Sequence, residues 1–258
     1  MTSFANDSHF FTMNDSQESE FNKLMHVRDT CDYLNAIDRL KLHNFSVLHM
    51  NVRSMKNKKD EIDNFLLRLD IPWDAICISE TWLKDDIVNL FQIDGYNCFA
   101  SCRQKGEGGG TAIYVHEKHD VIERRDLEST EFETTFLQLN LKTKELSKVI
   151  VGEIYRPPAS VNATFLSYME KVLDVIENEK KIAVIAGDFN YDLLPIFEKD
   201  GSNDFSNLLT AYGFFPLISR ATRKHKEVSS LLDNIFINDF QLYHSSGVII
   251  EDLSDHFP

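Results

Sequence analysis

The protein has 258 residues, of which 43% are hydrophobic, and this suits one large α/β domain with a substantial core. No apolar run approaches the roughly 18 residues of a membrane span, and no basic-then-apolar segment opens the chain, which argues against a transmembrane helix and a signal peptide. The net charge of −14 argues against tight, sequence-independent DNA binding, although an enzyme that collects carboxylates around metal ions can also be acidic.

Residues 1–44 differ in composition from the rest of the chain. Residues 14–20 are polar and acidic, which predicts a flexible arm. Apolar residues over 22–42 have spacings compatible with an amphipathic helix beside the domain. We therefore divide the chain into an acidic N-terminal arm, 1–44, and a domain, 45–258.

From residue 45 onward, short apolar runs alternate with amphipathic segments. Strands are predicted over 45–50, 75–79, 96–101, 111–115, 132–141, 148–155, 182–186, 231–237 and 248–250. Helices are predicted over 58–69, 160–177 and 204–212. So many strands between few helices favour an α/β fold in which two mixed β-sheets pack face to face with helices outside.

The four cysteines do not have the spacing of a zinc site. They are Cys31, Cys77, Cys98 and Cys102. Cys77 lies in an apolar run, where a thiol acts as a small hydrophobic group. We interpret all four as reduced thiols of an intracellular protein.

The run Gly187-Asp188-Phe189-Asn190 directly follows a fully apolar predicted strand. Alternation along an extended chain points Asp188 and Asn190 the same way and Phe189 the opposite way. The carboxyl end of a strand is where α/β enzymes place reactive groups. A carboxylate there can accept a proton from water, and the amide can orient it. Taken alone, the run is equally consistent with a plain turn.

Glu80 also follows a buried predicted strand. A carboxylate buried at a strand end is costly unless a cation or another partner meets it, and Mg²⁺ held by one or two carboxylates and several waters fits that need. The alternative is a surface glutamate at the start of a helix.

The C-terminal residues Asp255 and His256 form a third candidate. Asp255 can help to hold a metal ion or its waters, and His256 can contact a phosphoryl oxygen or transfer a proton. Such an imidazole needs an acid on its other nitrogen, and Asp233, inside an apolar predicted strand, is the candidate. The alternative is an edge-strand aspartate and an unrelated histidine near the chain end.

Asn51 and Tyr155 occupy similar positions at the ends of predicted strands, with Arg53 and Arg156 close by in the sequence. An amide can bind or orient a metal-bound group, and a phenol can donate a hydrogen bond to a phosphate. A tyrosine before Pro-Pro can also be a simple loop anchor.

Together, these residues indicate a protein family more specifically than any one of them does alone. The order Asn51, Glu80, Tyr155, Asp188-x-Asn190, Asp233 and Asp255-His256 resembles the endonuclease/exonuclease/phosphatase superfamily across residues 45–258. The short sequence motifs around these residues are similar to those of the endonuclease domain of non-LTR (LINE-type) retrotransposon proteins. The motifs that carry this are Asn51-Val-Arg-Ser54, Ser79-Glu-Thr-Trp-Leu83, Gly108-Gly-Gly-Thr-Ala-Ile-Tyr-Val115, Tyr155-Arg-Pro-Pro158, Gly187-Asp-Phe-Asn190, Ala221-Thr-Arg223, Leu232-Asp-Asn-Ile-Phe236 and Ser254-Asp-His256.

The resemblance implies a four-layer α/β sandwich like that of deoxyribonuclease I. It also implies that Glu80 binds Mg²⁺, with Mn²⁺ as a substitute, and that Asn51 and Asp255 lie near the metal. Asp188 would prepare the attacking water, Asn190 and Tyr155 would hold the phosphate, and Asp233 would orient His256.

The implied activity is the nicking of one strand of duplex DNA to leave a 3′-hydroxyl that primes reverse transcription. The DNA-facing residues implied are Arg53, Arg156, Thr222, Arg223 and Ser254, with residues 224–229 as a hairpin that probes the groove. A reverse transcriptase domain is expected downstream in the parent element, beyond this chain, and the expected location is nuclear without membrane contact. Two alternatives remain: a phosphatase or phosphodiesterase acting on a lipid or small phosphoester, and an inactive retrotransposon-derived remnant.

Overall fold

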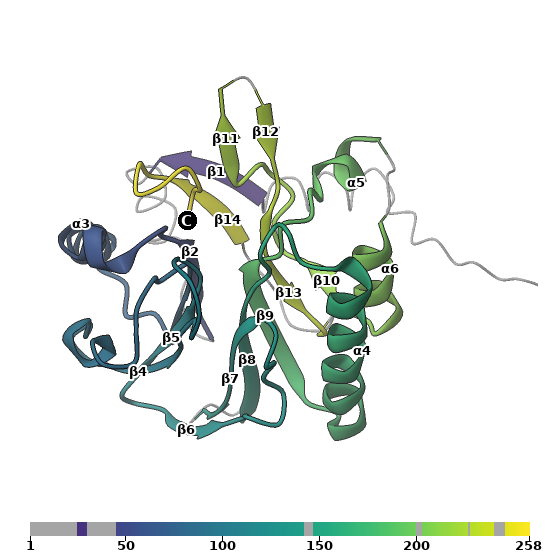
Figure 1. Ribbon diagram of the computed structural model, residues 1–258, viewed down its shortest axis with the longest axis horizontal. Helices are drawn as coiled ribbons and strands as arrows, with labels where there is room; N and C mark the ends of the chain where they lie inside the picture. Colours follow the sequence, from purple (N-terminus) through teal and green to yellow (C-terminus); the bar gives the residue numbers. More distant parts are fainter. Residues whose placement is uncertain (1–24, 30–44, 142–146, 200–202, 227, 240–245) are drawn as a thin grey trace, which may run out of the picture.

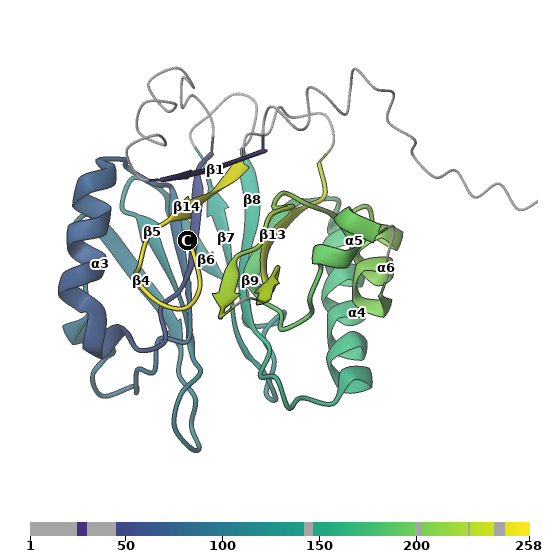
Figure 2. The ribbon, with the colours of Figure 1, turned by 90° about the horizontal axis from the view of Figure 1, so that it is seen from above.

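Two β-sheets pack face to face and helices cover their outer faces (Figures 1 and 2). The computed structural model describes residues 25–29, 45–141, 147–199, 203–226, 228–239 and 246–258. This is the predicted α/β fold of two mixed sheets, and the four layers are helix, sheet, sheet and helix.

The larger sheet has six strands in the order β10-β13-β9-β8-β7-β6. The strands are β6 (Asp120–Glu123), β7 (Glu133–Asn140), β8 (Lys148–Tyr155), β9 (Ile182–Asp188), β10 (Phe215–Pro216) and β13 (Asp233–Ile237). Among these described strands, β8 and β9 pair in parallel and the other neighbours are antiparallel. The long crossover between the two parallel strands contains helix α4 (Asn162–Glu179).

The smaller sheet has four strands in the order β2-β3-β5-β4. They are β2 (Val47–Asn51), β3 (Ala75–Ser79), β4 (Tyr96–Ser101) and β5 (Thr111–His116). β2 and β3 are parallel and are connected by helix α3 (Met55–Leu69), while a short 3-10 helix, η1 (Val88–Leu90), precedes β4. None of the described helices is long and apolar enough to cross a membrane.

Each outer face is closed by an amphipathic helix. α3 buries Ile62, Phe65 and Leu69 against the smaller sheet, which is the helical spacing that the sequence predicts. α4, α5 (Leu194–Lys199) and α6 (Asp204–Ala211) lie on the outer side of the larger sheet, as Figure 2 shows. Phe189 packs there against Phe205, with ring centroids 5.0 Å apart. The side chain after Asp188 therefore points into the helix-side core, as strand alternation predicted.

The layer between the sheets is filled mainly by small and branched side chains. Its buried members include Ala75, Cys77, Ile113, Val115, Leu137, Val149, Val151, Val184 and Ala186. The polar groups that interrupt this layer are therefore conspicuous, and most of them lie toward the edge where Asn51, Tyr155 and Asp188 end their strands.

Several elements of the structure differ from the sequence prediction. The amphipathic pattern over 22–42 was compatible with a helix, but Met25–Asp29 form strand β1, parallel to β14 (Ser246–Ile250); the remainder of 22–42 lies outside the described residues. The pairing is long-range, so no local periodicity could reveal it. The edge strands β6 and β10 and the short helix α5 were not predicted. The expected hairpin is present as β11 (Arg223–His225) and β12 (Val228–Ser230), projecting beyond the sheets in Figure 1.

Candidate active site

Strand register brings the predicted site residues to one edge of the sandwich. In the larger sheet, Asp188 pairs with Asp233 on one side and with Tyr155 on the other. In the smaller sheet, Asn51 ends β2 beside the end of β3, from which Glu80 follows. A hydrogen bond from Asn51 Nδ2 to Asp188 Oδ2 (2.8 Å) joins the two sheets at this edge.

Neutral donors hold the carboxylates of Glu80 and Asp188 beside each other. The Asn51 amide donates to Glu80 Oε1 at 3.0 Å as well as to Asp188. The indole N–H of Trp82 donates to the other Glu80 oxygen, Oε2, at 3.2 Å. The backbones of Glu80 and Trp82 lie in the left-handed region, with φ of 51° and 55°, a strained conformation that clusters at functional sites.

Asp188 is buried beside the carboxylate of Asp233, and both conditions affect its ionisation. Burial, with the negative charge of Asp233, raises the pKa of Asp188 to about 7. A carboxyl group that titrates near neutral pH is suited to take a proton from water. Gly187 allows this placement, because a Cβ there would lie 2.0 Å from the carbonyl oxygen of Ile154. The backbone N–H of Asn190 donates to Asp188 Oδ1 at 3.0 Å and orients the carboxylate.

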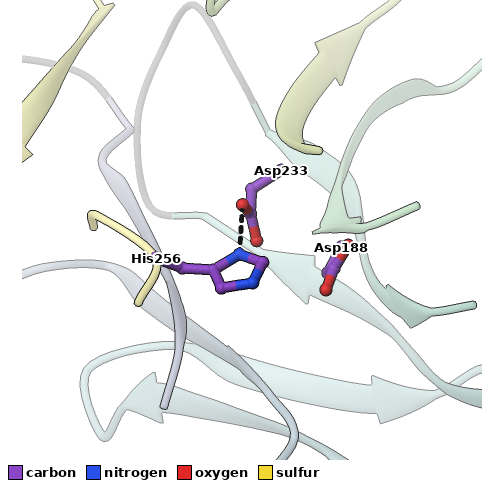
Figure 3. Close-up of side chains that lie close together, drawn as sticks. All are labelled: Asp188, Asp233 and His256. Carbon is purple, nitrogen blue, oxygen red and sulfur yellow. Dashed lines mark hydrogen bonds and ion pairs between the residues drawn. The ribbon is translucent and has the colours of Figure 1, made fainter. Parts of the chain in front are cut away.

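Asp233 and His256 form a buried ion pair next to Asp188 (Figure 3). His256 Nδ1 lies 2.7 Å from Asp233 Oδ2, and the Thr222 hydroxyl donates to the same oxygen at 2.8 Å. Burial disfavours charge on both partners, but their mutual attraction lowers the pKa of Asp233 and raises that of His256. The other ring nitrogen, Nε2, lies on the side of Asp188 in Figure 3 and is the atom that can meet a substrate.

Two overlapping sets of donors fit a divalent cation. Ligand atoms of Asp188, Asp233 and His256 lie within 4.8 Å of one another. The carboxylates of Glu80 and Asp188, bridged by the Asn51 amide N–H groups, form the second set, and these two carboxylates offer only oxygen ligands. Mg²⁺ prefers oxygen ligands and keeps several waters, whereas Asp233 and His256 already bond each other, so the second set fits Mg²⁺ better.

Asp255, predicted as a metal ligand, makes a different set of contacts. Its carboxylate bonds Arg53 at 3.0 Å and Arg223 at 2.8 Å. Partial burial opposes ionisation, but the bond from Arg53 and the charge of His256 hold the pKa of Asp255 below its usual value. The Ser254 hydroxyl donates to the backbone oxygen of Asn51 at 2.6 Å and fastens this turn to β2. A metal-binding role for Asp255 stays a prediction.

Arg156 was predicted to face DNA, and the structure places it inward. Its side chain is 6% exposed, and its guanidinium donates to the carbonyl oxygens of Phe189 and Asn190. The guanidinium also lies over the ring of Tyr191, at 4.3 Å from the centroid. Arg156 thus supports the loop that directly follows Asp188, and this placement does not favour its predicted DNA contact. Thr222 is likewise buried and serves Asp233.

Tyr155 and Asn190 lie at the site with different orientations. Burial, followed by the negative charges of Glu80 and Asp188, raises the pKa of Tyr155, so its phenol keeps its proton and can donate to a phosphate. The side-chain amide of Asn190 donates to the backbone oxygen of Arg156 at 2.8 Å. Its φ of 49° shows that the extended strand ends before it, which the alternation argument did not anticipate.

Sequence reasoning missed two buried polar residues behind the site. His49 lies on β2, two residues before Asn51, and Glu153 lies on β8, two residues before Tyr155. Residues two apart on a strand share a face, so both side chains point into the layer between the sheets. The available signal was a charged residue inside the apolar run 149–155, which resembles the signal that identified Asp233.

The fold and these contacts define an α/β sandwich of two sheets with a buried, carboxylate-rich edge. Residues 47–256 match the Endonuclease/Exonuclease/phosphatase family, and the chain belongs to this family. Members are typically hydrolytic nucleases and phosphatases. No curated protein sequence matches the chain significantly.

Several solved structures share the fold. The endonuclease domain of TRAS1, a telomere-specific non-LTR retrotransposon, is 18% identical with a TM-score of 0.61, covering 83% of this chain and 94% of that one. The 3′-5′ exonuclease NExo from Neisseria meningitidis is 15% identical with a TM-score of 0.59, covering 83% and 97%. An AP endonuclease from Archaeoglobus fulgidus is 16% identical with a TM-score of 0.56, covering 83% and 97%. The resemblance to a retrotransposon endonuclease is thereby confirmed at the level of family and fold.

Proposed function

We propose that this protein is a magnesium-dependent endonuclease that nicks one strand of duplex DNA and leaves a 3′-hydroxyl. The observation that carries the proposal is the union of two units at one edge: the Asn51–Glu80–Asp188 cluster and the Asp233–His256 pair. The first unit is suited to metal binding and water activation, and the second to contact with a phosphoryl group.

The sequence motifs that resemble those of retrotransposon endonucleases support DNA as the substrate within this family. They occupy the functional edge: Asn51 is at the end of β2, Glu80 follows β3, and Asp188 ends β9. TRAS1, whose endonuclease domain shares the fold, is a non-LTR retrotransposon, and this is the class of element that the sequence resembles.

In this mechanism, Asp188 accepts a proton from the attacking water, and its pKa of about 7 suits that step at neutral pH. The bound divalent cation would supply charge stabilisation at the phosphoryl oxygens. Nε2 of His256 contacts the phosphoryl group while Asp233 fixes the ring through Nδ1. The phenol of Tyr155 donates to the phosphate. The new bond joins the water oxygen to phosphorus, and the bond from phosphorus to the 3′ oxygen breaks. The phosphate stays on the 5′ oxygen, and the leaving 3′ oxygen takes a proton from solvent to become the 3′-hydroxyl.

A basic rim beside the site offers contacts for the DNA backbone despite the net charge of −14. The side chain of Arg53 is 47% exposed and that of Arg223 is 32% exposed. Between hairpin β11–β12 and the C-terminal turn lies a groove with a volume of about 520 Å³. It is lined by Lys224, Lys226, Asp252, Ser254, Asp255 and Phe257.

The test is relaxation of supercoiled plasmid in the presence of Mg²⁺. We expect conversion to open circles whose nicks a DNA polymerase extends, since extension requires a 3′-hydroxyl. Asp188→Ala should abolish nicking. Glu170→Ala, an exposed carboxylate on α4, is the matched control and should nick like the wild type. Nicking by Asp188→Ala at the wild-type rate would contradict the proposal.

The same preparation distinguishes the two alternatives. Release of phosphate from an inositol phosphate, with the plasmid left intact, would assign the site to a small phosphoester. Failure of a well-folded protein to act on either substrate would favour the inactive remnant.

A further inference from the structure

A chain of buried polar side chains runs from the middle of the sandwich to the active site. Glu153 Oε2 lies 3.2 Å from His49 Nδ1, and His49 Nε2 lies 3.3 Å from Asp233 Oδ1. Asp233 Oδ2 in turn lies 2.7 Å from His256 Nδ1. Glu153 is 0% exposed and His49 is 6% exposed, so this network is shielded from solvent.

The hydrogen-bonding capacity of these groups determines how they interact. Carboxylates only accept hydrogen bonds, and an imidazole can donate from both nitrogens only in its protonated form. A cationic His49 satisfies both contacts by donating from Nδ1 to Glu153 Oε2 and from Nε2 to Asp233 Oδ1. Burial raises the pKa of Glu153, and its other oxygen, Oε1, is buried without a hydrogen-bond partner among the described residues. Burying these charges between the sheets gives little net stability compared with apolar residues of similar volume.

The network acts on both oxygens of Asp233. His49, from the smaller sheet, holds Oδ1, while His256 and Thr222 hold Oδ2. Asp233 itself belongs to the larger sheet. The carboxylate plane, and with it the direction of the His256 ring, is therefore set by His49 from the smaller sheet together with Thr222 and His256.

We propose that His49, anchored by Glu153, is a positioning residue that fixes Asp233 so that His256 presents Nε2 to the phosphoryl group. This inference rests on the proposed function, because it assigns His256 to the phosphoryl group. It distinguishes His49 from residues that merely fill the layer between the sheets.

The structure supplies a matched control in the same layer. The hydroxyls of Thr111 and Thr135 bond at 2.8 Å between β5 and β7, and both residues are buried. Thr135→Val removes this inter-sheet hydrogen bond at nearly constant volume without touching Asp233. His49→Gln and Glu153→Gln are the test variants, and Glu153→Gln preserves size and an acceptor oxygen.

The kinetic experiment measures nicking of a duplex oligonucleotide at saturating Mg²⁺. Loss of an orienting partner behind a catalytic group typically costs about 10- to 100-fold in activity. We expect His49→Gln to lower kcat by this factor with KM nearly unchanged, Glu153→Gln to lower it less, and Thr135→Val to leave it unchanged. In the Asp233→Asn background, His49→Gln should add almost nothing, because it acts through Asp233. Multiplicative losses in that double variant would overturn the inference.

A second readout does not need activity. In protein labelled with ¹⁵N at the histidine rings, the His256 signals report the bond from Nδ1 to Asp233. We expect them to shift in His49→Gln and to stay in place in Thr135→Val. If the wild type fails to nick but the signals shift, the proposed function fails and the positioning role stands. Unshifted His256 signals in His49→Gln would sink the positioning role, whatever the nicking result.

Discussion

The two ends of the β-sandwich each bury an aspartate–histidine pair. At the candidate active site, Asp233 Oδ2 lies 2.7 Å from His256. At the opposite end, where β3 begins, Asp74 Oδ1 lies 2.6 Å from His119 Nε2. By distance and burial the two pairs are nearly the same, so an aspartate–histidine contact does not by itself mark a catalytic site.

The surroundings of the two pairs differ in charge. Asp74 also bonds Lys118 at 2.7 Å, and its other oxygen accepts from the backbone and hydroxyl of Ser46. At that end, the ammonium group of Lys118 therefore supplies the positive charge that balances Asp74. At the active-site end, the pair lies beside Asp188, whose carboxylate is bound by neutral donors, and Glu80 adds a second carboxylate with neutral donors. This excess of negative charge is what a divalent cation would balance.

The backbone differs in the same direction. Non-glycine residues with positive φ gather where β2, β3 and β9 end: Arg53, Ser54, Glu80, Trp82 and Asn190. Among the other described residues with this property, Asp70 and Lys180 are ordinary helix C-caps. Strain concentrated at one end is consistent with a site whose side chains are held for function rather than for packing.

The largest expected contrast between the ends is in activity. Asp188→Asn should reduce the nicking rate by about 10²- to 10⁴-fold, the usual contribution of a general base. Asp74→Asn should leave the rate per folded molecule within about twofold, because Asp74 lies at the far end. Initial nicking rates, normalised to the folded fraction from circular dichroism, measure both. Comparable losses in the two variants would remove the functional distinction between the ends.

Metal binding gives the next contrast. A ligand at 100 times its Kd stabilises the folded state by about 2.7 kcal/mol. We expect such Mg²⁺-dependent stabilisation in the wild type and in Asp74→Asn, and its loss in Glu80→Gln, in urea unfolding with and without EDTA. If Glu80→Gln keeps the full Mg²⁺ effect, the cation binds elsewhere and the oxygen-only ligand set is wrong.

Much of the fold could be predicted because local patterns carried it. Ile62, Phe65 and Leu69 recur at helical spacing, and α3 buries those side chains. Residues 75–78 are all apolar because β3 is covered on both faces. Strand β1 could not be predicted in this way, since its partner β14 is more than two hundred residues away and the pairing is set by tertiary contact.

The site was predictable where a polar residue ended an apolar strand, as with Glu80 and Asp188. The sequence could not show in which direction a side chain points or which partner it contacts. Arginine is a residue type that often contacts DNA, yet the Arg156 side chain points inward and contacts aromatic rings and backbone carbonyls. Aspartate is a residue type that often binds metal ions, yet the carboxylate oxygens of Asp255 form ion pairs with Arg53 and Arg223. Competition between partners decides these placements, and the partners are distant in sequence.

A smaller effect, of opposite sign at the two ends, is expected in stability. Although burial would raise it, the bonds from Lys118, His119 and Ser46 lower the pKa of Asp74, so its stabilising contribution is present above the unfolded pKa of about 3.9 and is lost as pH falls through the folded pKa. The pKa of Asp188 is raised, so its ionisation between about 3.9 and about 7 reduces the stability of the metal-free protein as pH rises.

Urea unfolding in EDTA tests this sign difference. At pH 8, Asp188→Asn should stabilise the protein by on the order of 1 kcal/mol, and the gain should disappear near pH 4, where the wild-type carboxyl is already neutral. Asp74→Asn should destabilise it by about 1–3 kcal/mol at pH 8, because it weakens several buried hydrogen bonds. Destabilisation by both substitutions at pH 8 would show that the negative charge on Asp188 does not reduce the stability of the folded protein.

The smallest effect concerns the basic rim, which distinguishes the active-site end without taking part in the chemistry. Arg223→Gln should raise KM for duplex DNA by about fivefold, on the order of 1 kcal/mol, and reduce the dependence of log KM on log salt concentration by about one unit. kcat should hardly change, because Arg223 bonds Asp255 and not Asp188. The matched control is Arg125→Gln, an exposed arginine beyond the edge strand β6, whose neutralisation should leave both the KM and the salt dependence as they are. Equal effects of the two substitutions would mean that DNA responds to overall charge. An effect confined to Arg223 would show that a local basic rim overcomes the net charge of −14.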